Sequence, residues 1–298
     1  MNVFTTDIDL FWNAWESTRD LPQSAQAEAF EDNYRGRGSR GLRDFWLSQI
    51  ESGSQLASTI SAHPRYYESL RPLTQSFRAQ VTLILDQAAR LKALLPTVRL
   101  PDTYLLVGRM NSGGTVTDAG QLIGTEMFGL SAVTPMDELG DWHRAVLRPP
   151  DALPAIVLHE TVHSNQRTLN PSSLLGKSIV EGAADFVVTL LVGKHTSPHH
   201  VFGRAHEAAL WERFRSEMHT EDFSGWMFEG EQARDRPADL GYYVGHQICA
   251  SYFARQTSPA VALQDILTVQ DFGSFLVESQ YDGSGPDPDE FSFAVCGS

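Results

Sequence analysis

The 298-residue sequence has little positive charge, no long apolar run and few cysteines. Lys and Arg number 23 against 37 Asp and Glu, which gives a net charge of −14. Nucleic acids and anionic lipid surfaces are bound by basic clusters, so this balance argues against both as partners. No apolar run approaches the ~20 residues that a membrane-spanning helix needs. Of the two cysteines, we expect Cys249 to be a buried thiol and Cys296 to lie in a tail, with no disulfide between them.

The remaining composition is typical of a soluble globular protein. Hydrophobic residues make up 42% and charged residues 20% of the chain. This length is enough for one large domain or two closely packed ones, and it leaves the oligomeric state open. The N-terminal residues are acidic and lack an apolar core, so we expect no signal peptide. We therefore expect a cytoplasmic protein, or an exported one if the chain is a trimmed form.

The most informative segment is His159-Glu160-Thr161-Val162-His163. On a helix, histidines at positions i and i+4 lie on one face, where both imidazoles can share a metal ion. The apolar run 152–158 precedes the motif and predicts one buried side of such a helix. Asp151 is a suitable N-cap, and Pro154 is tolerated in the first turn. The segment therefore predicts a metal-binding helix, on which Glu160 faces a reacting water.

A catalytic zinc site needs a third protein ligand, and Glu181 is the best candidate. It lies 18 residues after His163, which leaves room for a loop and a second helix. The small residues 182–184 favour a close approach of this helix to the first. Asp185 shares a face with Glu181, and we expect it to accept the second ring N–H of a ligand histidine. We expect one zinc ion per chain, although iron and manganese use the same ligand types.

Two histidines on one helix and a Glu-x-x-x-Asp pattern on the next resemble the gluzincin metallopeptidases. More specifically, the chain resembles the predicted Zn-dependent proteases of the DUF2268 type and the related gliding-motility lipoprotein B-like proteins. Three further stretches carry this resemblance: 11–12 (Phe-Trp), 109–115 (Arg-Met-Asn-Ser-Gly-Gly-Thr) and 241–245 (Gly-Tyr-Tyr-Val-Gly). The resemblance implies a zincin fold and a peptidase-like site, without naming a substrate.

The expected fold class is α+β and predominantly helical, with a thermolysin-like catalytic core and a small β-sheet. We expect an N-terminal helical region over 1–96, a zincin-like catalytic region over 97–280 and a tail over 281–298. Apolar residues at helical spacing near the N-terminus predict a core-facing helix, and a long helix should end before Pro96. Residues 32–43 are charged and rich in glycine, and predict a loop. Further helices are expected over 178–192, 199–218 and 240–256.

Residues rich in β-formers predict the small sheet just before the metal-binding helix. Short strands are expected at 98–107, 115–117 and 122–123. We expect the segment 111–116 to be the sheet edge that pairs with an extended substrate, as the resemblance favours, because its glycines admit a close backbone. An ordinary glycine turn remains the alternative. The expected substrate-binding residues are Asn111, Gly113, Gly114 and Thr115.

The chemistry of such a site assigns a role to Glu160 and requires a hydrogen-bond donor. Glu160 would take a proton from the attacking water and pass it to the leaving amine. Tyr242 and His246 lie four residues apart on a predicted helix, so both can face the site and stabilise the oxyanion. The resemblance favours Tyr242, and a tyrosine of the core is the alternative. We expect the neighbouring histidines of residues 194–200 to be solvated and not to bind the metal.

These observations predict zinc-dependent hydrolysis of a peptide bond in a peptide or protein substrate. The alternative is a metal-bearing but non-proteolytic protein that uses the same cleft for binding or assembly. A purely structural zinc ion is not expected, because such sites are usually closed by cysteines and neither cysteine is spaced to join the histidine pair. The sequence leaves open whether the enzyme is an endo- or exopeptidase.

Overall fold

The computed structural model describes residues 1–167, 171–193, 197–229, 233 and 235–287. Residue contacts divide the chain into two compact units, one of residues 1–88 and 100–160 and one of residues 89–99 and 161–298. The division passes through two helices, α6 (Thr74–Leu94) and α8 (Leu153–His163), which each contribute to both units. The functional regions 1–96 and 97–280 expected from the sequence stay a prediction. The tail beyond residue 287, with Cys296, and His195 lie outside the described residues.

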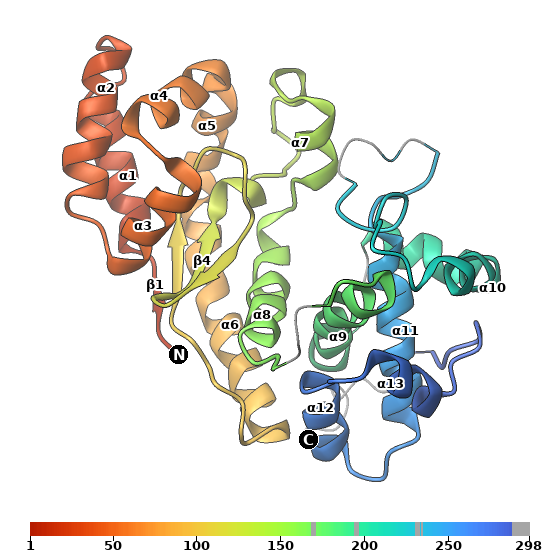
Figure 1. Ribbon diagram of the computed structural model, residues 1–298. Helices are drawn as coiled ribbons and strands as arrows, with labels where there is room; N and C mark the ends of the chain where they lie inside the picture. Colours follow the sequence, from red (N-terminus) through yellow and green to blue (C-terminus); the bar gives the residue numbers. More distant parts are fainter. Residues whose placement is uncertain (168–170, 194–196, 230–232, 234, 288–298) are drawn as a thin grey trace. The chain divides into compact units, whose positions relative to one another are not determined.

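The first unit begins with a series of short helices (Figure 1). They are α1 (Thr6–Glu16), α2 (Gln23–Ala29), η1 (Phe30–Arg35), α3 (Arg40–Phe45), η2 (Trp46–Ile50), α4 (Gly53–Ala62), α5 (Pro64–Leu70) and η3 (Arg71–Leu73). The apolar stripe predicted near the N-terminus is confirmed as core, since Ile8, Phe11, Trp12 and Trp15 are all buried on α1. The rings of Phe11 and Phe30 stack with centroids 5.6 Å apart.

The loop expected over residues 32–43 is wrong in most of its length. The π-helix η1 continues α2 as far as Arg35, and α3 begins at Arg40. Tyr34 explains the difference, because its buried hydroxyl donates to the carbonyl of Val107 at 2.8 Å and accepts from the amide of Val107 at 2.9 Å. Tyr34 and Val107 are far apart in the sequence, so the local glycine content of residues 32–43 does not indicate this contact.

A four-stranded sheet lies in the same unit. Its strands are β1 (Val3–Phe4), β2 (Thr103–Leu106), β3 (Thr115–Thr117) and β4 (Gly120–Gly124), in the order β1-β2-β4-β3. The strands β1 and β2, and β2 and β4, run parallel, whereas β3 is antiparallel to β4 with Thr115 opposite Leu122. The short strands predicted around 115–117 and 122–123 are therefore confirmed, and β3 lies at one edge. The strand β1 is unexpected, and Phe4 stacks there on Tyr104 with ring centroids 4.7 Å apart.

The first unit ends with elements that lead to the predicted metal-binding motif. They are η4 (Thr125–Phe128), η5 (Met136–Glu138), α7 (Asp141–Val146), η6 (Pro150–Ala152) and the start of α8. Leu153, Val157 and Leu158 are buried, which confirms the apolar run as the inner side of α8.

The second unit is helical in its described part. Its helices are α9 (Leu174–Val192), α10 (Pro198–Glu217), α11 (Leu240–Ala254), α12 (Pro259–Leu267) and α13 (Phe272–Ser279) (Figure 1). The helices expected over 178–192, 199–218 and 240–256 correspond to α9, α10 and α11. Cys249 is a buried free thiol, as predicted. The chain as described is predominantly helical with a small mixed sheet, so the α+β class is confirmed.

Glycines bring α9 and α11 close together. A Cβ at Gly245 would lie 1.6 Å from the carbonyl oxygen of Ser178, and one at Gly182 would lie 2.1 Å from the amide nitrogen of His246. The three atoms nearest to an added Cβ at Gly182 all belong to α11. Gly182, the small residue after Glu181, therefore allows α11 to pack closely against α9. The sequence analysis had expected a close approach of α8 instead. None of the described helices is long and apolar enough to cross a membrane.

Candidate metal centre

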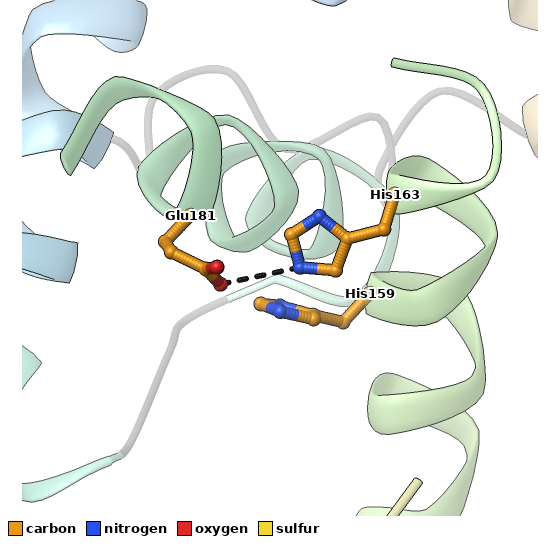
Figure 2. A group of neighbouring side chains, drawn as sticks. All are labelled: His159, His163 and Glu181. Carbon is orange, nitrogen blue, oxygen red and sulfur yellow. Dashed lines mark ion pairs between the residues drawn. The ribbon is translucent and has the colours of Figure 1, made fainter. Parts of the chain in front are cut away.

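The predicted metal ligands lie together at the end of α8 and in the middle of α9. His159 and His163 are one turn apart on α8, so their side chains leave the same face of this helix. Nε2 of His163 lies 3.2 Å from Oε2 of Glu181. Figure 2 shows both imidazoles pointing from α8 toward the carboxylate on α9. The ligand atoms of His159, His163 and Glu181 all lie within 4.8 Å of one another.

This donor set fits a zinc ion of the catalytic type. Two imidazoles and one carboxylate leave a fourth position of a tetrahedral ion open for a reacting water. The side chains of His163 and Glu181 are 22% and 16% exposed, so the site is partly shielded but open to solvent. A closed structural cage would need a fourth protein ligand.

One partner of this site was missed by reasoning from the sequence. Oε1 of Gln166 lies 2.7 Å from Nδ1 of His163, and Nε2 of the same amide donates to the carbonyl of Val180 at 2.7 Å. Gln166 is three residues beyond His163, in the turn after α8. Its spacing from His163 is a signal that the sequence contains, because residues i and i+3 lie on the same side of a helical turn.

Tyr242 on α11 contacts the carboxylate of Glu181, the predicted third ligand. Its side chain is hydrogen-bonded to Glu181. The pKa of Tyr242 is raised well above its ordinary value, first because burial desolvates the phenolate, and then because the carboxylates of Glu181, Asp239 and Asp185 repel its negative charge. Tyr242 is therefore a neutral phenol at physiological pH and can donate a hydrogen bond.

His246, four residues further along α11, lies deeper in the second unit. Its side chain is buried, and its Nε2 lies 3.1 Å from Oγ1 of Thr189. Its ring packs edge-on against Phe186 and against His200, with ring centroids 5.7 Å and 4.6 Å apart. These contacts are those of a core residue, and a catalytic role for His246 stays a prediction.

Asp185 contacts two histidines at the start of α10. Its Oδ2 lies 2.9 Å from Nε2 of His200 and 3.4 Å from Nε2 of His199. The sequence-based expectation that these histidines are solvated is wrong for His200, which is 1% exposed. Pro198 occupies the first turn of α10, so both histidines lie on the helix that was predicted over 199–218. Whether Asp185 also orients a ligand histidine stays a prediction.

Asp185, His199 and His200 form a second group whose donor atoms lie within 4.8 Å of one another. The distance of 2.9 Å between Nε2 of His200 and Oδ2 of Asp185 is that of an ordinary hydrogen bond between an imidazole and a carboxylate. The arrangement is therefore explained without a cation.

In the first unit, the predicted substrate edge lies beside Glu160. A Cβ added to Gly114 would lie 3.5 Å from Oε1 of Glu160, whereas one added to Gly113 would meet only Met127, at 4.0 Å. Thr115 begins the edge strand β3. The side chain of Asn111 donates to the carbonyl of Gln49 at 3.0 Å, so its described contact fixes the loop. Substrate contact by these four residues stays a prediction.

The buried carboxylate of Glu126 binds the backbone just before this loop, and the sequence analysis did not predict it. The side chain of Glu126 accepts hydrogen bonds from the amides of Gly108 at 2.8 Å and Met110 at 3.3 Å. Burial raises the pKa of Glu126 to about 7, although these two amides oppose the shift. Met110 has a left-handed backbone, with φ of 59°, at the bend before Asn111.

One known protein family matches the segment that carries the predicted ligands. No curated protein and no solved structure matches the chain. The matched segment extends from Leu147 to Val269 and includes the three predicted ligand residues, Gln166 and Tyr242. The predicted resemblance to the DUF2268 type is therefore confirmed: residues 147–269 match the family model of the predicted Zn-dependent proteases, DUF2268.

Proposed function

We propose that the protein is a zinc-dependent peptidase of the gluzincin type, with a thermolysin-like catalytic core. The observation that carries the proposal is the convergence of His159, His163 and Glu181 within a segment that matches a predicted Zn-dependent protease family. His159 and His163 would bind zinc as neutral imidazoles, and Glu181 as a carboxylate. Zinc, when bound, lowers the pKa of water and polarises a carbonyl group.

Glu160 is the proposed general base and acid. It lies next to a ligand on α8, and it carries a carboxylate that can take a proton from the attacking water. The same carboxyl group would then protonate the leaving amine. Gly114 supports this role, because the absence of a side chain there leaves space beside Oε1 of Glu160.

Tyr242 is the proposed donor to the oxyanion. A neutral phenol that is hydrogen-bonded to a metal ligand stands beside the position where a polarised carbonyl would bind. When Glu181 binds the metal, the single O–H of Tyr242 would turn from this carboxylate to the negative charge that develops on the carbonyl oxygen. His246 is the weaker candidate for this role, since its described contacts lie in the core.

The proposed substrate is an extended peptide or protein segment that pairs with β3. Among the described strands, β3 pairs with β4 alone, so one of its edges is open to strand addition. Pairing there would bring a substrate backbone along Gly113, Gly114 and Thr115, beside Glu160.

Metal content and peptide cleavage, measured on the same samples, test the proposal. We expect about one zinc ion per wild-type chain and cleavage of a peptide library that a chelator abolishes. Glu181→Ala should lose the zinc, whereas Glu278→Ala, an exposed position on α13, should retain it. Glu160→Gln should retain zinc and lose cleavage.

The outcomes separate the peptidase from the alternative. Zinc bound through Glu181 without any cleavage would favour the non-proteolytic binding or assembly protein. A wild-type protein that stays free of metal when zinc is supplied would overturn both. Cleavage that survives in Glu160→Gln would remove Glu160 from the mechanism.

A further inference from the structure

We propose that Gln166 is a positioning residue, which fixes the tautomer of His163 and sets its Nε2 against Glu181. The inference rests on the proposed function in one respect, namely that His163 is a metal ligand. It concerns the free protein, however, and can be tested before any metal is added.

The hydrogen bonds around Gln166 determine the orientation of its side-chain amide. The carbonyl of Val180 can only accept, so the atom 2.7 Å from it must be the NH₂ group of Gln166. The amide oxygen therefore faces His163, 2.7 Å from Nδ1. An amide oxygen can only accept, so Nδ1 of His163 must carry a proton.

The protonated Nδ1 leaves the other ring nitrogen as the ligand atom. In the neutral imidazole, one nitrogen is a donor and the other carries a lone pair. In this neutral form Nε2 carries the lone pair, and it lies 3.2 Å from Oε2 of Glu181. The hydrogen bond from Gln166 thus selects the ring nitrogen that faces Glu181, which is the nitrogen that would bind a metal ion.

Gln166 also ties the two ligand-bearing helices together. Val180 precedes Glu181 on α9, and Gln166 follows the C-terminus of α8, so one amide links the backbone beside one ligand to the ring of the other. The backbone N–H of Gln166 donates to the carbonyl of Val162 at 3.1 Å, which fixes the position of the residue after α8. Loss of the amide should therefore affect both the direction of the ring and its distance from Glu181.

The neighbouring residue provides a matched control. Asn165 also has a half-buried side-chain amide in the same turn, but its described bonds do not include His163. Its Nδ2 donates to the carbonyls of Thr161 at 2.7 Å and Arg99 at 2.8 Å and to Oγ of Ser164 at 3.3 Å. Its Oδ1 accepts from the amide of Arg99 at 2.7 Å. Asn165→Ala should lower stability without changing the tautomer of His163 or the affinity for zinc.

The test compares Gln166→Leu, Gln166→Glu and Asn165→Ala with the wild type. The tautomer of His163 in the metal-free protein is read from its ring ¹⁵N resonances, and the zinc dissociation constant is measured by competition with a chelator. Gln166→Leu, which removes both hydrogen bonds, should weaken zinc binding roughly 10- to 100-fold. Gln166→Glu retains an acceptor for Nδ1–H but loses the donor to Val180, and should recover most of the affinity.

Several results would overturn the inference, and they differ from failure of the proposed function. A metal-free wild type in which the neutral ring of His163 carries its proton on Nε2 would contradict it even if every variant failed to fold. An unchanged tautomer and unchanged affinity in folded Gln166→Leu would do the same. Absence of zinc binding or of cleavage in the wild type would count against the proposed function, whereas the tautomer would still decide the role of Gln166.

Discussion

The side chain of Tyr242 on α11 is hydrogen-bonded to the carboxylate of Glu181 on α9. This contact depends on the close approach of the two helices at Gly245, where no side chain could fit against Ser178. A residue that the sequence offers as an oxyanion donor is thus held directly against the expected third ligand of the metal. The relationship makes the role of Tyr242 open to a direct test.

Tyr242→Phe should lower kcat for peptide cleavage while zinc remains bound. Removal of one hydrogen-bond donor to a developing oxyanion typically costs about 10²- to 10³-fold in kcat. Steady-state kinetics and zinc content on the same sample check this expectation. Tyr252→Phe is the matched control and should retain kcat. It removes a hydroxyl on the same helix, and this hydroxyl donates to Asp265. Equal kinetics in wild type and Tyr242→Phe would leave Tyr242 as a residue of the core.

Gly114→Ala should reduce cleavage without displacing the metal. Its new methyl group would lie 3.5 Å from Oε1 of Glu160 and 3.1 Å from Ile123, so it would occupy space beside the proposed base. Kinetics of peptide cleavage, with zinc content as the control for the site, measure the effect. In Gly113→Ala the methyl group meets only Met127, so the loss should be smaller. An equal loss of cleavage in Gly113→Ala and Gly114→Ala would show that the reduced backbone freedom of alanine, and not the methyl group beside Glu160, causes the effect.

Gly245→Ala should destabilise the second unit. An added Cβ would lie 1.6 Å from the carbonyl oxygen of Ser178, so α9 and α11 would have to separate. Overpacking of this kind costs about 1–3 kcal/mol or more. Thermal unfolding should show a lower Tm, and zinc affinity should fall with it because α9, which carries Glu181, is displaced. Gly273→Ala on α13 meets only an Asp271 oxygen at 3.3 Å, and a Tm lowered as much as in Gly245→Ala would refute the packing argument.

The buried carboxyl of Glu126 should make stability depend on pH. Its pKa is raised from 4.5 to about 7 in the folded protein, chiefly by burial. Because the folded state holds the proton more tightly than the unfolded state, the contribution is fully present below pH 4.5 and is lost as pH rises through 7. The shift corresponds to about 3 kcal/mol.

Urea unfolding at pH 5 and pH 8 measures this effect. The free energy of unfolding should fall toward the higher pH in the wild type, and Glu126→Gln should lose most of that dependence. The amide cannot titrate, and its single oxygen can keep the shorter hydrogen bond from Gly108 while the longer one from Met110 is lost. A pH dependence that is the same in both proteins would show that other groups cause it.

Local periodicity made much of this protein predictable. The period of an α-helix alone places His159 and His163 on one face of α8, and it places Asp185 on the face of α9 that carries Glu181. Turn and strand signals likewise located β3 and β4 to within a few residues, because antiparallel neighbours joined by a short turn depend on nearby sequence. The apolar stripe of α1 was readable for the same reason.

Contacts between distant segments were decided by the tertiary structure. The strand β1 is only two residues long and pairs with β2, about 100 residues away, so no local pattern indicates it. Burial of His200 against Asp185, the fit of Gly245 on Ser178 and the hydrogen bond of Gln166 to Val180 all require particular helices to pack side by side. Spacing along the chain specifies which side chains share a face, because backbone geometry repeats. It does not specify which face of another element they meet, because that depends on how the whole core packs.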